Sequence, residues 1–122
     1  MVNEIKAKLF QLKLHRATVV LPDVGELTVQ EITGAQREKF ESMVLNKRRE
    51  AENAKRDLDL SGSKALLVQM SVIDPETGEL MFGLEDLAKL GVLPSRTLES
   101  LFSASQDVSG IGRDEEQKVE EN

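Results

Sequence analysis

Apolar and polar residues change their period several times along the chain, and each period predicts a different element. Phe10, Leu12 and Leu14 alternate with polar residues, a pattern typical of a strand, whereas residues 1–8 give a mixed signal. Two more β-rich runs follow, the first ended by a proline, at residues 18–21 and 27–30. The alternation predicts a two- or three-stranded antiparallel sheet within residues 9–32, with Leu27 and Val29 on its buried face.

A long helix is predicted next. Thr33 and Gln36 have the spacing of a capping box, so the helix begins near Gly34, and its pattern continues to about Asp57. Apolar positions recur at helical spacing, interrupted by Lys47. We name six of them the apolar stripe: Phe40, Met43, Val44, Ala51, Ala54 and Leu58. A narrow, alanine-rich stripe on a charged helix has two interpretations: packing in the chain's own core, or a face for self-association or for a partner helix.

The second half of the chain contains a sharp turn between apolar runs. Residues 64–73 fit a helix and a strand equally well, and we favour a helix to about Ser71. Pro75 fits the second position of a turn, and Gly78 can adopt a positive φ. We therefore expect a short hairpin that pairs residues 72–73 with 80–82, with Leu80 and Phe82 packed on neighbouring helices.

Two further helices are predicted, over residues 84–90 and from Ser95 to about Gly110. The fold class is therefore α+β: a small N-terminal antiparallel β-sheet followed by a mainly α-helical body with a short β-hairpin. We expect a single domain over residues 1–112. Residues 113–122 carry five acidic and two basic side chains and only one large apolar residue, which predicts an acidic disordered tail.

Composition narrows the possible functions. The chain has 122 residues, enough for one core, and only 3% of them are aromatic, so that core is aliphatic. The net charge of −6 argues against nucleic-acid binding, which needs a positive surface. The sequence contains no cysteine, no secretory signal and no apolar run of membrane-spanning length, and we expect an intracellular protein that binds no membrane.

The candidates for chemistry are isolated. His15 has no nucleophile near it in sequence and is interpreted as an ordinary sheet or turn histidine. Asp57 and Asp59 before Gly62 lack the bidentate glutamate of a calcium loop. Other acidic or glycine-rich positions are interpreted as turn residues rather than as acids or a nucleotide motif: Asp74, Glu76, Glu79 and Gly110-Ile111-Gly112. We therefore predict no catalytic residue, no metal site and no cofactor.

Three blocks within residues 20–110 resemble the tail assembly chaperones of long, non-contractile-tailed bacteriophages. The first is a strand that runs into a helix near Gly-Ala-x-Arg, the second an apolar run with an Asp, a turn glycine and Leu-x-Phe, and the third a leucine-rich helical pair. In this sequence they are Leu27 to Arg37, Met70 to Phe82 and Leu84 to Phe102.

The resemblance implies a non-enzymatic function in the host cell cytoplasm. It implies that the chain binds the phage tape measure protein, keeps it soluble and is absent from the mature virion. It also implies a homo-oligomer and a longer form, made by ribosomal frameshifting, that recruits the tail tube protein. The alternative is a structural head–tail connector or minor tail component that stays in the virion. A small enzyme is disfavoured, since the chain has one histidine, no cysteine and few aromatics.

Overall fold

The structure is a computed structural model that describes residues 1–55, 57–58 and 61–111. It begins with a helix, α1, over Val2–Phe10, followed by a connection to the first strand, β1, over Arg16–Leu21. The strand predicted from the alternation of Phe10, Leu12 and Leu14 is therefore wrong. The register gives the reason. The first residue of β1, Arg16, lies opposite Gln30, which is the last residue of the neighbouring strand. Among the described residues, no strand lies beside those before His15.

The sheet has three strands within the described residues. β1 pairs antiparallel with β2, Gly25–Gln30, and β2 pairs with β3, Val72–Ile73, so the order is β1-β2-β3. The predicted antiparallel sheet is confirmed, but its third strand comes from the middle of the chain. Leu27 and Val29 lie on the buried face, as expected from their alternation.

The long helix, α2, spans Gly34–Ala54, and its predicted capping box is confirmed. The Gln36 backbone N–H donates to Thr33 Oγ1 at 3.2 Å, and the Thr33 N–H donates to Gln36 Oε1 at 2.8 Å. The helix ends earlier than predicted. Lys55 has a left-handed conformation, with φ of 52°, and its N–H donates back to Ala51 and Glu52 carbonyls, which closes the last turn.

The ambiguous segment is a helix and then a strand. α3 spans Ser61–Ser71 and passes directly into β3. The predicted turn follows, with Gly78 at φ of 77°, and the Asp74 N–H donates to the Glu79 carbonyl at 2.8 Å. The returning segment forms one bridge, between Ile73 and Leu80, rather than a full strand. Leu80 is exposed, contrary to expectation, whereas Phe82 packs against the core as predicted.

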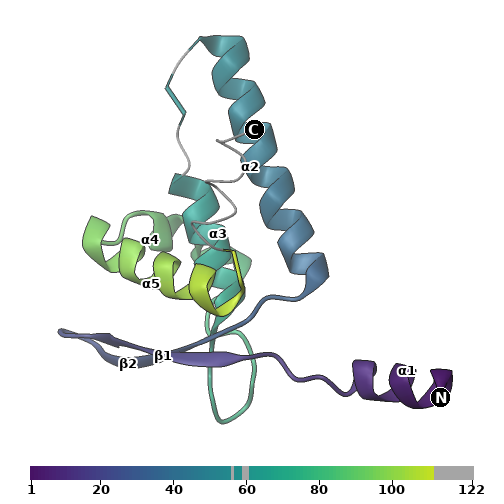
Figure 1. The fold of residues 1–122 in the computed structure, drawn as a ribbon. Coiled ribbons are helices and arrows are strands. Elements are labelled where there is room, and N and C mark those ends of the chain that lie inside the picture. Colours follow the sequence, from purple (N-terminus) through teal and green to yellow (C-terminus); the bar gives the residue numbers. More distant parts are fainter. Residues whose placement is uncertain (56, 59–60, 112–122) are drawn as a thin grey trace.

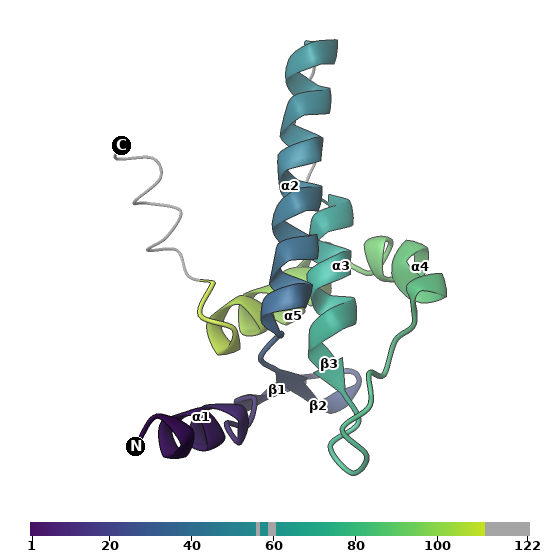
Figure 2. The same cartoon turned by 90° about the vertical axis from the view of Figure 1, so that its right-hand side faces the viewer.

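The last elements cover the sheet. A 3₁₀ turn, η1, spans Leu84–Asp86, and α4 and α5 span Leu87–Gly91 and Ser95–Val108. Figures 1 and 2 show α3 beside α2, α5 lying across the sheet, and α1 standing away from the other helices. The predicted α+β class is confirmed. The domain boundary predicted at residue 112 and the acidic tail predicted at 113–122 lie outside the described residues.

Two buried clusters hold these layers together. The larger cluster joins the sheet to α3, α4 and α5 through Leu21, Leu27, Val29, Ala65, Val68, Val72, Leu90, Leu98 and Leu101. The smaller cluster joins α2 to α3 through Ile32, Phe40, Leu67 and Met70. The clusters are aliphatic apart from Phe40, as the composition predicts. Because the smaller cluster lies near the first half of α2, the rest of that helix is held by far less apolar contact.

Candidate functional site

The structure divides the apolar stripe between the interior and the surface. Phe40 and Ala51 are buried, each 8% exposed, and Val44 packs against the smaller cluster. Ala54 is exposed, and Leu58, which the sequence placed on the same helix, lies beyond the end of α2 and is 45% exposed. The first half of the stripe therefore packs within the chain, while its far end is open to solvent.

Met43 completes the stripe on the side of α3. The side chain is half-buried, and a Cβ placed on Gly62 would lie 3.5 Å from its Cε, an ordinary van der Waals distance, so Met43 lies against the first turn of α3. Gly62, considered above only as part of a calcium loop, belongs to that turn. Only the open end of the stripe, at Ala54 and Leu58, is therefore exposed to other chains, and its binding to them stays a prediction.

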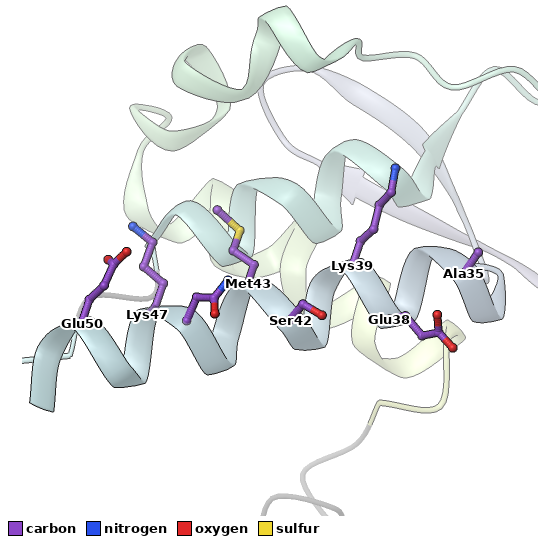
Figure 3. Close-up of a pocket in the computed structure, with 8 residues that line it drawn as sticks. Ala35, Glu38, Lys39, Ser42, Met43, Lys47 and Glu50 are labelled. Carbon is purple, nitrogen blue, oxygen red and sulfur yellow. The ribbon is translucent and has the colours of Figure 1, made fainter. Parts of the chain in front are cut away.

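A hollow of about 720 Å³ flanks the stripe on α2 (Figure 3). Its lining comes from one helix, with the side chains of Lys39, Met43 and Lys47 directed towards α3 and that of Glu38 directed away. The lining mixes both signs of charge with one thioether, and nothing in it pairs a nucleophile with a base. This hollow is a solvated helix flank.

A second hollow, of about 510 Å³, lies between α2, α3 and α5, and more large apolar side chains line it than line the first. We name it the α2–α5 groove; its apolar residues are Phe40, Val44, Leu45, Phe102 and Ile111. Its rim is charged, with residues Glu41, Arg48, Lys64 and Glu99. A groove with an apolar floor and a charged rim suits the apolar face of a helix.

Three contacts shape the α2–α5 groove. The rings of Phe40 and Phe102 are tilted by 52°, with their centroids 6.4 Å apart. Lys64 Nζ lies 5.4 Å from the Phe102 ring centroid and donates to Glu99 Oε2 at 2.7 Å. α5 contributes four of the twelve residues that line this groove, so the stripe on α2 alone does not reveal it. The sequence places Phe102 on the apolar side of the last helix, and this is its only indication that the last helix contributes to the groove.

Ser63 lies beneath the same groove and is 1% exposed. Its Oγ has no hydrogen-bond partner among the described residues. Two other buried serines differ, since Ser71 and Ser105 donate to the carbonyls of Leu67 and Leu101 at 2.7 and 2.8 Å. Ser63 is therefore a local weakness in the packing of α3.

The other candidates for chemistry have structural functions where they are described. His15 is exposed, and its backbone N–H donates to Glu31 Oε1 at 3.1 Å. Asp74 Oδ1 accepts from the Glu76 N–H at 2.9 Å, which closes the turn. Asp59 and Gly112 lie outside the described residues. Within the described ranges, no three acidic or histidine side chains gather as metal ligands, and no helix is long and apolar enough to cross a membrane.

The similarity of this chain to known proteins lies in its fold rather than in its sequence. No protein-family model matches the chain, and no curated protein matches it. Among solved structures, the chain is similar to the bacteriophage HK97 tail assembly chaperone, with a TM-score of 0.58 and 15% sequence identity. The similarity covers 88% of this chain and 95% of that one. The family resemblance read from the three sequence blocks is therefore confirmed at the level of the fold.

Proposed function

We propose that this chain is a non-enzymatic tail assembly chaperone of a bacteriophage. The observation that carries the proposal is the fold, which is similar to that of the HK97 tail assembly chaperone over nearly the whole of both chains. The three sequence blocks point to the same family independently of the coordinates. The client is the tape measure protein, which the chaperone binds and keeps soluble in the host cytoplasm.

The surface of the chain supports binding of a helical client. The α2–α5 groove and the open end of the apolar stripe are both bordered by α2, and both offer aliphatic side chains. Such side chains adapt to varied apolar partners, and a helix presents matching anchors at i, i+3, i+4 and i+7. The net charge of −6 keeps a chaperone–client complex in solution.

The remaining parts of the proposal follow the family resemblance. The chaperone forms a homo-oligomer, so that several copies act on one long client with the gain of multivalency. A longer, frameshifted form recruits the tail tube protein. Neither form stays in the mature virion.

Co-expression with the tape measure protein of the same phage tests this function. We expect the chain to raise the amount of soluble client and to co-purify with it. Leu58→Asp places a charge at the open end of the stripe and should lower that amount, whereas Asn53→Asp adds the same charge at an exposed α2 position and should not. If the client stays insoluble and mass spectrometry finds the chain in purified virions, the protein is a structural tail or connector component instead.

A further inference from the structure

Exposed apolar side chains concentrate at the N-terminal end of the chain. Of the fifteen large hydrophobic residues exposed in the described structure, eight lie within residues 1–20: Met1, Val2, Ile5, Leu9, Phe10, Leu12, Leu14 and Val20. None of the nine residues of α1 is buried. Such a concentration of exposed apolar side chains in one segment is typical of a site of interaction.

The sequence of α1 has the pattern of a helix that packs on other helices. Val2, Ile5 and Leu9 are spaced by three and four, and Leu12 continues the repeat just beyond the helix. These four side chains are 80%, 67%, 58% and 75% exposed. A helix of nine residues is marginal by itself in water, because helices shorter than about 12 residues need tertiary packing. The helix α1 is therefore incomplete without a surface to cover it.

The body of the same chain does not provide that surface. Both Figure 1 and Figure 2 show α1 standing apart from α2–α5, joined to β1 by residues 11–15. A symmetric pair of α1 helices is also disfavoured. Residues 1–13 carry three lysines against one glutamate, so two copies of α1 would bring like charges together.

We propose that α1 of one copy docks in the α2–α5 groove of a second copy. The lengths agree, because the α2 wall of the groove runs from Phe40 to Arg48, nine residues like α1, which is about 14 Å of helix. The apolar floor of the groove lies where Val2, Ile5 and Leu9 would pack. This inference rests on the self-association in the proposed function and assigns the surfaces that produce it.

Charge supports the same arrangement. Lys6 and Lys8 flank the apolar face of α1, and Glu41 and Glu99 stand on the rim of the groove. Each rim carboxylate has a partner already, Arg37 or Lys64, yet their side chains are 60% and 58% exposed and can accept a second cation. The rim also carries Arg48 and Lys64, so the attraction depends on Lys6 and Lys8 of α1, in a segment of net charge +2, being seated beside the two carboxylates.

The contact is heterologous, because α1 and the groove are different surfaces. Each docked pair keeps one free α1 and one free groove, so further copies add head to tail until a ring closes. We therefore expect a series of oligomers rather than a dimer that excludes further copies.

Cysteine cross-linking tests the contact directly, since the natural chain has no cysteine. A chain with Ile5→Cys is mixed with a chain with Leu45→Cys, a groove position that is 49% exposed and so tolerates the change. We expect a disulfide-linked heterodimer under mild oxidation. The matched control, Ala7→Cys mixed with Leu45→Cys, places the thiol on the opposite side of α1 and should give at most a tenth of that product.

Two results would overturn the proposal: equal yields from Ile5→Cys and Ala7→Cys, or a preference of Ile5→Cys for its own copy, which would mean pairing between α1 helices. Light scattering gives a second measurement. Ile5→Asp with Leu9→Asp should raise the concentration needed for association roughly tenfold or more and shift the mass towards 13.6 kDa, whereas Ala7→Asp should not. Neither assay contains the tape measure protein, so failure here and failure of the chaperone function are separate results.

Discussion

The smaller buried cluster is the attachment of α2 to the body, and Leu67→Ala tests it. Leu67 is 0% exposed and belongs to that cluster together with Ile32, Phe40 and Met70. Replacing a fully buried leucine by alanine removes its transfer free energy and leaves a cavity, which together cost 2–5 kcal/mol in well-packed cores. Because α3 is pinned between two clusters and cannot collapse into the space, we expect about 3 kcal/mol of lost unfolding free energy.

Urea unfolding followed by far-ultraviolet circular dichroism measures this loss. With a slope near 1.5 kcal/mol per M, the midpoint should fall by about 2 M. Leu45→Ala is the matched control on α2, because its side chain is 49% exposed and should change the unfolding free energy by no more than about 0.5 kcal/mol. If Leu67→Ala and Leu45→Ala shift the midpoint equally, α2 is not held by this cluster and its position on the body is wrong.

Three further substitutions test local features through the thermal midpoint of the same signal. Thr33→Ala removes the capping hydroxyl of α2 and should cost about 1 kcal/mol; no change would mean that the capping box does not hold in solution. Ser63→Ala removes a buried hydroxyl without a described partner and should leave stability unchanged or higher, whereas Ser71→Ala breaks a hydrogen bond and should cost about 1 kcal/mol; the reverse order would refute the assignment. Gly78→Ala forces a side chain into positive φ and should cost about 1 kcal/mol of stability. Gly91→Ala is its control, because the glycine has open space where a Cβ would lie and no positive φ, and it should be neutral or stabilising. Equal effects of the two substitutions would contradict the conformation of the turn.

Local chemistry made part of the fold predictable from the sequence. Thr33 and Gln36 determine the start of α2 by bonding to each other's backbone, and Pro75 and Gly78 determine the turn by their own φ angles. These features depend on residues a few positions apart. The periodicity of residues 64–73 does not tell a helix from a strand. The change from α3 to β3 depends on strand pairing, because Val72 pairs with Val29, which is far away in the sequence.

Long-range contacts also explain what the sequence could not predict. Alternation at Phe10, Leu12 and Leu14 satisfies the period of a strand, but a strand needs a neighbour, and β2 ends opposite Arg16. The helical spacing of Val2, Ile5 and Leu9 immediately before that alternation is the competing signal, and the chain follows it as α1. The α2–α5 groove could not be predicted for a similar reason. It depends on the contact between Phe40 and Phe102, which are far apart in the sequence and come together only in the folded chain.

The division of α2 links the fold to the proposed function. The helix has 21 residues, about 32 Å, whereas α3 has 11, about 16 Å, so α3 supports only part of its length. Figure 2 shows α2 rising beyond α3. Past Arg48 only Ala51 is buried on α2, and charged residues dominate there. The apolar stripe as far as Ala51 was thus available to the interior, and Ala54 and Leu58 were not. A helix that projects beyond its own core with an apolar edge has surface to offer to other chains, which is what the binding of a long helical client by several copies requires.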